Sequence, residues 1–293
     1  FGFPCNDFSL VGSQKGLKGS FGPLYKEGIR ALDDHNPLFF VAENVGGIRS
    51  SDEGRAFRQI LEEMSSAGTH GYRVVPHYYR FEEYGVPQAR HRVVVVGIRG
   101  DLGLEFKVPS PEPYKFVDVS SRTCLTVPPI DNKAANHDFP MQSDKVRRRL
   151  QHIQPGKNAF NSDLPPELRL NVNGATLSQI YKRLDPSKPS YTVTGSGGGG
   201  THIYHWEEPR ALTNRERARL QTFPDSFEFV GGRESVRKQI GMAVPVQGAR
   251  VVFWAIFKTM LGEGYQSITP NLGGFLGGNT DEHQLQFDFS SEE

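Results

Sequence analysis

The run His-Arg-Val-Val-Val-Val-Gly-Ile at residues 91–98 decides the fold class of this chain. A second run, Pro-Leu-Phe-Phe-Val-Ala-Glu at residues 37–43, is also apolar and ends in a carboxylate. Continuous apolar runs rich in β-branched residues, without polar alternation, are typical of strands covered on both faces, as in a parallel sheet. The two runs therefore predict buried strands of a parallel sheet in an α/β fold.

An amphipathic helix is predicted between these strands. Its apolar residues recur with the i, i+3, i+4, i+7 spacing of one helix face, and Gly68 follows them as a residue that can end the helix. These apolar residues are Phe57, Ile60, Leu61 and Met64. The first hundred residues thus predict part of a sheet with helical crossovers.

Composition is that of a globular protein and argues against several other classes. Of the 293 residues, 37% are hydrophobic and 23% are charged, and the net charge of +1 does not by itself predict a nucleic-acid partner. No segment approaches the ~20 consecutive apolar residues of a membrane span, so no membrane association is expected. Cys5 and Cys124 are the only cysteines, and they match neither a disulfide framework nor a zinc site. A reducing cytoplasm is the simpler location, and no metal is expected.

Beyond residue 100 the chain changes character and later returns to regular structure. Residues 101–189 are rich in Pro, Asn, Asp and Ser and hold one basic helix at 144–150, which predicts a small loop-rich domain. Thr213 and Glu216 have the spacing of a capping box that opens a further helix. Apolar residues around much of the circumference at 246–261 predict a last, well-buried helix.

Four short stretches carry residues with catalytic potential. The stretches are Pro4-Cys5-Asn6, Glu43-Asn44-Val45, Gln88 to Arg92, and Arg210 to Asp225. The carboxyl ends of parallel strands converge on one edge of a sheet, where open α/β proteins bind ligands. We therefore expect Cys5, Glu43 and the arginines of the third stretch to meet, although they are far apart in sequence.

These stretches resemble the motifs of the DNA (cytosine-5) methyltransferase family. The Pro-Cys, Glu-Asn-Val and Gln-x-Arg-x-Arg motifs are matched by Pro4-Cys5, by Glu43-Asn44-Val45 and by Gln88, Arg90 and Arg92. The long Arg-x-Leu-Thr-x-Arg-Glu-x-Ala-Arg-Leu-Gln-x-Phe-Pro-Asp motif is matched at 210–225, and a closing Gly-Asn-Ala-Val-Pro motif at 241–245. Each motif alone is a weak signal, but five in the family's order make a strong one.

The resemblance implies a fold and a division of the chain. The fold is a Rossmann-like S-adenosylmethionine-dependent methyltransferase sheet, incomplete at its N-terminus, with a second, small, loop-rich target-recognition domain. Residues 1–100 are then a partial catalytic domain, 101–209 the target-recognition domain, and 210–265 a return to the catalytic domain. No Lys or Arg follows Lys258, and the Gly-rich residues 266–293 predict a flexible acidic tail.

The resemblance also implies a reaction on a cytosine flipped out of double-stranded DNA. The Cys5 thiolate would add to C6 of the base and make C5 nucleophilic. Glu43 would hold N3, Arg92 would contact the O2 side, and Arg90 would help to position Cys5 and the base. S-adenosylmethionine would supply the methyl group, and sequence-specific modification of restriction-modification type in a bacterial cytoplasm would be the setting.

Further contacts follow from the same resemblance. Cofactor contacts are expected from Pro4, Met242 and Ala243, and DNA contacts from Ser9, Lys15, Lys18, Thr192, Val193, Gly197, Gly198 and Arg148. Two of these assignments have open alternatives. The basic cluster at 145–149 is either a DNA contact or a solvated helix face, and the glycine run at 195–200 is either a close approach to DNA or a plain linker. The 210–225 motif is expected to buttress the recognition domain without a catalytic step, and Cys124 to be structural.

The chain departs from the family pattern at three places. Asn6 stands where the family has Gln, and Met242 stands where it has Asn. The Phe-x-Gly-x-Gly loop that cradles S-adenosylmethionine ahead of the catalytic cysteine is not matched in this sequence. We therefore expect a separate N-terminal chain or segment to supply that loop.

Two other functions remain open from the sequence. One is a non-catalytic DNA-binding or regulatory subunit, but such a subunit need not retain Cys5, Glu43, Arg90 and Arg92 together. The other is an RNA cytosine-5 methyltransferase of similar fold. The long region 101–189 favours DNA, because a sizeable recognition domain suits the reading of a duplex.

Overall fold

The computed structural model describes residues 1–3, 24–170, 179–195, 197–198 and 200–276. The chain divides into two compact units. The first comprises the described parts of residues 1–80, 91–112 and 250–276, and the second those of residues 81–90 and 113–249. The second unit thus contains residues 210–249, which the sequence analysis grouped with the catalytic domain.

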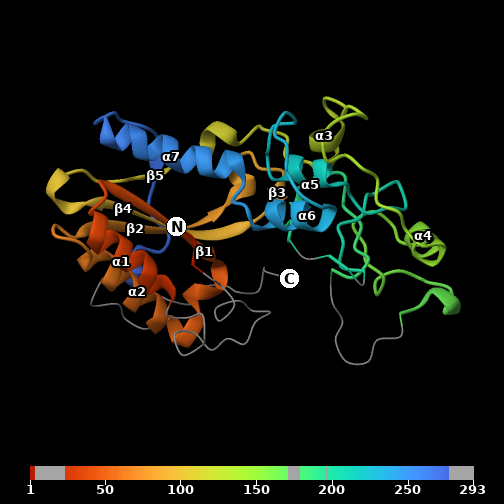
Figure 1. Cartoon of the computed structure of the whole chain (residues 1–293), viewed down its shortest axis with the longest axis horizontal. Coiled ribbons are helices and arrows are strands. Elements are labelled where there is room, and N and C mark those ends of the chain that lie inside the picture. Colours follow the sequence, from red (N-terminus) through yellow and green to blue (C-terminus); the bar gives the residue numbers. More distant parts are fainter. Residues whose placement is uncertain (4–23, 171–178, 196, 199, 277–293) are drawn as a thin grey trace. The chain divides into compact units, whose positions relative to one another are not determined.

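A three-stranded sheet forms the centre of the first unit (Figure 1). β4 (His91–Arg99) lies between β1 (Phe39–Val45) and β2 (Tyr72–Arg80), and it runs antiparallel to both. Both predicted strands therefore exist, but the prediction that they run parallel is wrong. A continuous apolar run indicates that both faces of a strand are covered, and it carries no information about the direction of the neighbouring strand.

Helices cover both faces of this sheet. α1 (Tyr25–His35) and α2 (Arg55–Ser66) lie on one side, and α7 (Val246–Met260) lies on the other (Figure 1). Val93 and Val95 belong to the hydrophobic cluster that includes α2, whereas Val94 and Val96 point to the opposite face and are also buried. This double coverage explains the unbroken valine run of β4.

The predicted amphipathic helix is confirmed as α2. Its four predicted apolar residues are at most 1% exposed: Phe57, Ile60, Leu61 and Met64. Burial of each such side chain stabilises the fold by about 1.5–3 kcal/mol. The helix ends at Ser66, and Gly68 follows with a φ of +69°, a left-handed conformation that favours glycine.

The residues that follow α7 are folded as far as residue 276, so the predicted flexible tail is wrong for that stretch. β7 (Ser267–Ile268) pairs antiparallel with β5 (Val108–Pro109). Leu272 and Phe275 are 1% and 4% exposed, and the Phe275 ring lies 5.0 Å from that of Phe57. The prediction relied on the glycine-rich, acidic composition of the stretch and did not weigh these two apolar residues. The rest of the predicted tail lies outside the described residues.

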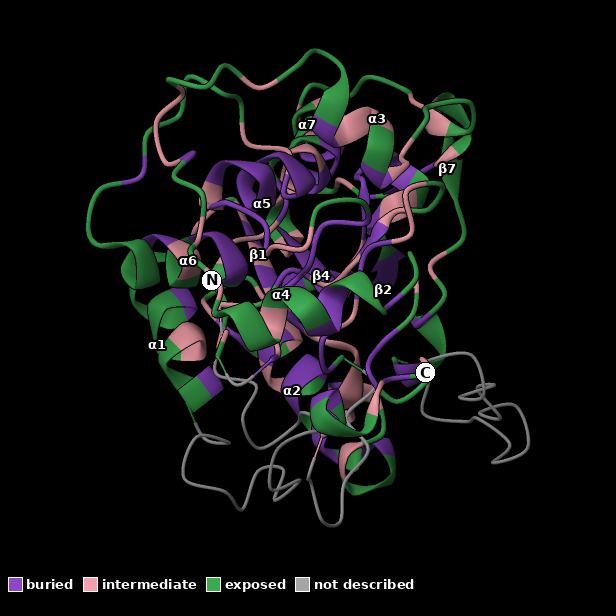
Figure 2. Cartoon of the chain, turned by 90° about the vertical axis from the view of Figure 1, so that its right-hand side faces the viewer, coloured by how far each residue is buried: buried purple, intermediate pink, exposed green. Residues whose placement is uncertain are grey.

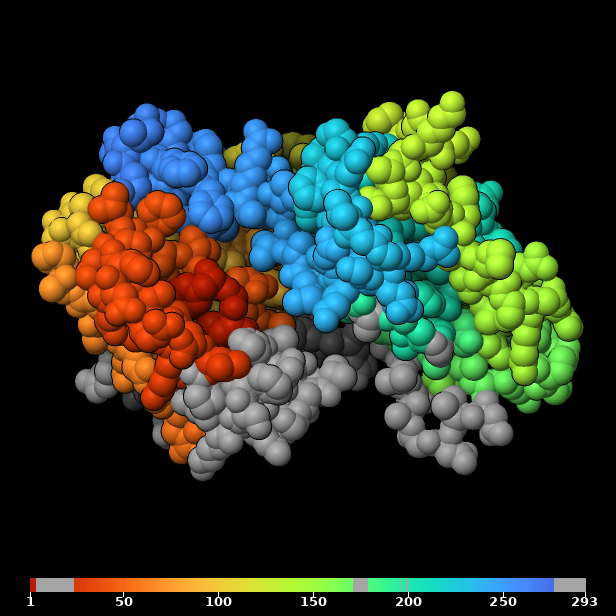
Figure 3. Space-filling model, viewed as in Figure 1, coloured from red at the N-terminus to blue at the C-terminus, as the bar shows by residue number. Residues whose placement is uncertain are grey.

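The helix α7 is confirmed, but the prediction that it is well buried holds for one of its faces only. Val251 and Ile256 are buried, whereas Phe253, Trp254 and Phe257 are 40%, 47% and 57% exposed. Figure 3 shows α7 (blue) at the surface of the molecule. The sheet covers only one side of the helix, which leaves an aromatic face in solvent.

One stretch of the described chain, Arg233–Met260, has the length and apolar composition of a membrane-crossing helix. It is not one continuous helix in the fold, because α6 (Arg233–Met242) and α7 are separated at a segment that contains Pro245. Its α7 part carries buried core residues such as Ala255 and Ile256. Its composition is therefore that of core helices.

The second unit consists mainly of loops and short helices. Its helices besides α6 are α3 (Ser121–Thr126), α4 (Asp144–Gln151) and α5 (Asn214–Leu220), and β3 (Gln88–Ala89) pairs parallel with β6 (Ser190–Tyr191). The predicted basic helix is thus confirmed as α4. Short 3₁₀ helices in the chain are Gly46–Arg49, Ser51–Gly54, Phe81–Tyr84, Gly100–Leu102, Glu112–Tyr114, Pro166–Leu168 and Gly273–Phe275.

The predicted capping box is confirmed at the start of α5. The Thr213 hydroxyl accepts a hydrogen bond from the Glu216 backbone N–H at 3.1 Å, and the Glu216 carboxylate accepts one from the Thr213 N–H at 2.7 Å. Arg210 donates to the same carboxylate from two nitrogens, at 2.8 Å each. Figure 2 shows α5 largely in the buried colour, whereas much of α4 is exposed.

Candidate active site

Glu43 and Arg92 form an ion pair on neighbouring strands of the first unit. Arg92 lies opposite Val45 in the β1–β4 register, so Glu43, two residues earlier on the same face, is within reach of its side chain. Arg92 Nε lies 2.8 Å from Glu43 Oε1, and Arg92 Nη1 donates to the His91 carbonyl oxygen at 2.7 Å. The side chains of Glu43 and Arg92 are 24% and 14% exposed, so a ligand can reach them. Among the described residues, none bonds to Glu43 Oε2 or to Arg92 Nη2.

Residues 1–3 run parallel to β1 beside this ion pair. The Phe1 carbonyl oxygen accepts a hydrogen bond from the Glu43 backbone N–H at 3.1 Å. Asn44 Nδ2 donates to the Phe3 carbonyl oxygen at 3.3 Å, and Asn44 Oδ1 accepts from the Val45 N–H at 2.8 Å. Asn44 therefore ties this segment to the end of β1, a role that the sequence analysis did not assign.

Several predicted site residues lie outside the described residues. They are Cys5 and Pro4, and the predicted DNA contacts Ser9, Lys15 and Lys18. Phe3 is the last described residue before them.

Arg90 is buried in the second unit, where it holds two backbone segments. Its Nη1 donates to the Val193 carbonyl oxygen at 3.1 Å, and its Nη2 donates to the Gly241 carbonyl oxygen at 3.2 Å. Arg90 is only 3% exposed. These contacts fix two backbone segments of its own unit, and the predicted role of Arg90 in positioning Cys5 and the base stays a prediction.

Gln88 completes this framework. Its Oε1 accepts from the Val193 N–H at 2.8 Å, and its Nε2 donates to Gln221 Oε1 at 3.0 Å. The Gln-x-Arg motif and the 210–225 motif therefore meet around residue 193. Gly241 lies against the same backbone, because a Cβ there would come within 2.0 Å of the Gly195 nitrogen. This close approach explains the glycine of the closing motif.

The family model for C-5 cytosine-specific DNA methylases matches residues 1–258. The chain belongs to this family. The prediction of a DNA (cytosine-5-)-methyltransferase is thereby confirmed.

Type II methyltransferases are among the relatives of this cytosine methylase chain. It is 57% identical to type II methyltransferase M.BbvI of Brevibacillus brevis over 268 residues, which are 92% of this chain and 71% of the relative. It is 44% identical to M.NgoFVII of Neisseria gonorrhoeae over 251 residues, which are 84% of this chain and 66% of that relative. The chain thus spans about two thirds of the length of these relatives.

A solved structure supports the α/β fold. It is described as a DNA modification methyltransferase encoded within an Escherichia coli prophage, and it matches with a TM-score of 0.65 at 21% identity. The match covers 89% of this chain and 78% of the other. At this identity the likeness concerns the fold alone, and the predicted α/β class is confirmed.

The predicted DNA contacts of the methylase have different surroundings in the structure. Thr192 Oγ1 donates to the Ala89 carbonyl oxygen at 2.9 Å. The Val193 side chain is completely buried in a hydrophobic cluster of the second unit, and the predicted DNA contact at this position stays a prediction. The Gly198 carbonyl oxygen accepts from the Thr201 N–H and hydroxyl, whereas a side chain at Gly198 would meet open space.

The basic helix α4 divides into exposed and buried arginines. Arg148 is exposed, and its guanidinium lies 3.3 Å from the Glu167 carboxylate. Arg149 is 5% exposed, donates to the Leu168 carbonyl oxygen at 2.8 Å and lies over the Tyr181 ring. Arg149 is thus structural, and the prediction that the whole cluster faces DNA or solvent is wrong at this position.

The expected cofactor residues lie at the end of α6. Met242 is 70% exposed, and the Ala243 carbonyl oxygen accepts a hydrogen bond from Gln221 Nε2 at 3.2 Å. Both side chains are apolar, so they fit an apolar part of S-adenosylmethionine and offer nothing to its charged groups. Cys124 is mostly buried, and burial raises the pKa of its thiol to about 12. It is therefore held as the unreactive thiol, in line with the structural role expected for it.

Buried arginines stabilise the second unit, and the sequence analysis missed most of them. Arg183 is 5% exposed and donates to the carbonyl oxygens of Leu150, Ile153 and His205, each at 2.9 Å. Loops leave many carbonyl oxygens without partners in regular structure, and a guanidinium with five donors can satisfy several of them. The sequence signal that could have identified Arg183 as buried is an arginine beside apolar residues in a loop-rich segment.

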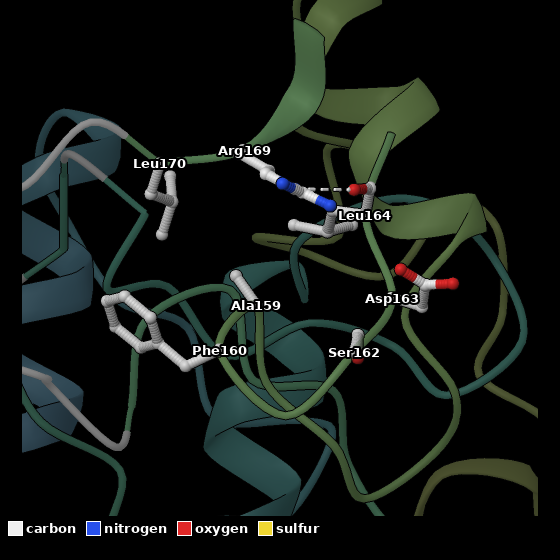
Figure 4. Close-up of a pocket in the computed structure, with 7 residues that line it drawn as sticks. All are labelled: Ala159, Phe160, Ser162, Asp163, Leu164, Arg169 and Leu170. Atoms are coloured by element: carbon white, nitrogen blue, oxygen red, sulfur yellow. Dashed lines mark hydrogen bonds between the residues drawn. The ribbon is translucent and has the colours of Figure 1, made fainter. Parts of the chain in front are cut away.

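The second unit also contains a cavity of about 240 Å³. Phe160, Leu164 and Leu170 give it apolar walls, and Ser162, Asp163 and Arg169 add polar groups (Figure 4). Arg169 Nε donates to the Leu164 carbonyl oxygen at 3.1 Å. None of the residues predicted for the site lines this cavity.

Proposed function

We propose that this chain methylates C5 of a cytosine in double-stranded DNA through a covalent adduct at Cys5. The observation that carries the proposal is the Glu43–Arg92 pair, which lies beside the segment that leads to Cys5. The Asn44 side chain donates to the Phe3 carbonyl oxygen, so the last described residue before Cys5 lies at the end of the strand that carries Glu43.

Cys5 is proposed as the nucleophile. Its thiolate forms a bond to C6 of the cytosine, and the electron pair of the C5–C6 double bond moves to C5. C5 can then take the methyl group. Loss of the C5 proton to a base returns the electron pair to the ring, and the Sγ–C6 bond breaks to free Cys5.

Glu43 and Arg92 are proposed to bind the ring during this addition. Glu43 Oε2 has no described partner and would hold the protonated N3, whose charge develops as the thiolate adds. Arg92 fixes the other carboxylate oxygen, and its Nη2 would donate to O2 of the base. The ion pair thus orients both groups before the base arrives.

S-adenosylmethionine would supply an electrophilic methyl group when bound. Met242 and Ala243 are proposed to contact its apolar part, and Pro4 is proposed beside it. Arg90 is proposed as a positioning residue, because it fixes the backbone at Val193 and Gly241. Thr192, Gly197, Gly198 and exposed Arg148 remain proposed DNA contacts, together with Ser9, Lys15 and Lys18.

The biological setting is proposed from the relatives. Type II methyltransferases from bacteria suggest sequence-specific DNA modification beside a restriction enzyme, in the cytoplasm. We propose that residues 101–209 contribute the target recognition and that residues 1–100 and 210–265 contribute the catalytic domain. The cofactor-binding loop that this sequence does not match is proposed to come from a further polypeptide segment.

A covalent trap tests the proposal. DNA that contains 5-fluorocytosine lacks the C5 proton, so the adduct cannot resolve after methyl transfer. With S-adenosylmethionine and the cofactor-binding segment present, the wild type should form a denaturant-stable complex, and Cys5→Ser should form none while it still binds DNA.

Cys124→Ser is the matched control and should trap like the wild type, since Cys124 is half-buried and burial raises the pKa of its thiol. A denaturant-stable complex formed by Cys5→Ser would refute Cys5 as the nucleophile. So would the absence of this complex in a folded Cys124→Ser variant.

A further inference from the structure

A polar cavity of about 590 Å³ in the second unit carries an excess of positive charge. Lys133, Arg233 and Asp138 line it, which leaves one net positive charge from two cations and one anion. No described residue forms an ion pair or a hydrogen bond with the side chain of Lys133 or Arg233. Asn132 and His137 add neutral polar groups to the same wall.

His137 lines this cavity and contacts the start of α5. Its Nδ1 lies 2.9 Å from the Thr213 hydroxyl oxygen, which already accepts a hydrogen bond from the Glu216 N–H. This contact fixes the His137 ring beside the cavity wall.

The start of α5 fixes both walls of the cavity. His137 is bonded to Thr213, and the Arg233 carbonyl oxygen accepts a hydrogen bond from Asn214 Nδ2 at 2.9 Å. Arg215 Nε donates to the Ala135 carbonyl oxygen at 2.9 Å.

Asn136, which has a φ of +65°, exchanges two hydrogen bonds with the Phe229 backbone, at 3.0 and 3.1 Å. The cavity is therefore preorganised by the motif to which the sequence analysis gave no chemical step.

We propose that this cavity is an oxyanion site that binds a phosphodiester group of the DNA backbone. Lys133 and Arg233 provide the charge, and the Asn132 side-chain amide provides a neutral donor. The Asp138 carboxylate repels the anion and weakens its binding. The inference rests on the proposed function in one respect, namely that DNA is the substrate. It gives the Arg-x-Leu-Thr-x-Arg-Glu motif a part in DNA binding.

Equilibrium binding of duplex DNA to the 293-residue chain tests this site. The measurements use the Cys5→Ser background without cofactor, so they are independent of methyl transfer. Lys133→Ala and Arg233→Ala should each weaken binding by about tenfold, because each removes a charge-assisted hydrogen bond. Each should also reduce the slope of log K against log salt by about 1. Asp138→Asn should strengthen binding by about threefold.

Lys26→Ala is the matched control, because it removes one exposed positive charge from α1, outside the cavity. The proposal is overturned if the cavity variants bind like this control, or if Asp138→Asn weakens binding in a protein of unchanged unfolding temperature. Binding of inorganic phosphate, measured at constant ionic strength, distinguishes a site for free phosphate from a site for a DNA phosphodiester. Loss of phosphate binding with unaltered DNA binding would assign the cavity to free phosphate and overturn the DNA assignment. Absence of DNA binding by the Cys5→Ser parent itself would instead contradict the proposed function.

Discussion

At the residue scale, arginines of this chain divide by what their guanidinium groups contact. Arg92 faces a carboxylate in a partly exposed position, whereas Arg90 and Arg183 are buried and donate to backbone carbonyl oxygens. Sequence motifs selected Arg90 and Arg92 equally, because a motif records residue type and spacing. Burial and partners then separate a residue suited to touch the base from one that holds the protein backbone.

Glu43→Gln should reduce the single-turnover rate of methyl transfer by about 10²–10³-fold, because the amide cannot stabilise the positive charge at N3. DNA affinity should change little, since the proposed role concerns the transition state. Rapid-quench measurement of methyl transfer in the complete enzyme gives the rate. Glu62→Gln is the control, because it replaces an exposed carboxylate of α2, and it should retain the wild-type rate. A Glu43→Gln variant that matched this control would remove Glu43 from the reaction.

At the element scale, local signals predicted helices better than the sheet. The spacing of apolar residues in α2 and the capping box of α5 depend on contacts within a few residues, so the sequence states them directly. The antiparallel order β1-β4-β2 depends on pairings between distant segments. Strand β2 also contains a feature that its sequence did not single out, a buried histidine.

His77 in β2 should make the free energy of unfolding depend on pH in the acidic range. It is 5% exposed, its Nδ1 accepts from the Asn271 N–H at 3.2 Å, and burial lowers its pKa from 6.5 to about 4. Between these values the unfolded chain binds the proton and the folded chain does not, so stability falls as the pH drops from 6.5 to 4. The loss reaches about 3 kcal/mol at the lower end.

His77→Asn retains an acceptor for the Asn271 N–H without the titration. Chemical unfolding of both proteins at several pH values should therefore show a shallower dependence for the variant over this window. Equal slopes for the two proteins would exclude His77 as the source.

At the scale of the whole molecule, the first unit exposes an apolar surface that its own described residues leave open. Phe253, Trp254 and Phe257 of α7 and Leu38 beside β1 are each at least 40% exposed. The sequence contains no match to the family's Phe-x-Gly-x-Gly cofactor-binding loop. The proposal that this loop comes from a further segment rests on that missing motif.

The 293-residue chain should therefore bind S-adenosylmethionine weakly and should methylate DNA only when the cofactor-binding segment is supplied. Isothermal calorimetry of the chain, with and without that segment, measures the difference. Saturable, stoichiometric binding by the chain alone would contradict the prediction.

The sequence by itself determined the family, because the motifs are short and their order is preserved along the chain. It also predicted the reaction and the residue types proposed to carry it. It also determined α2, α4 and α5, whose signals lie within one or two helical turns. Only the tertiary structure decided that β1 and β4 run antiparallel, that Glu43 contacts Arg92, and that Val193 and Arg149 are buried. Strand direction, ion pairing and burial arise from contacts between segments far apart in the chain, and no local pattern encodes such a contact.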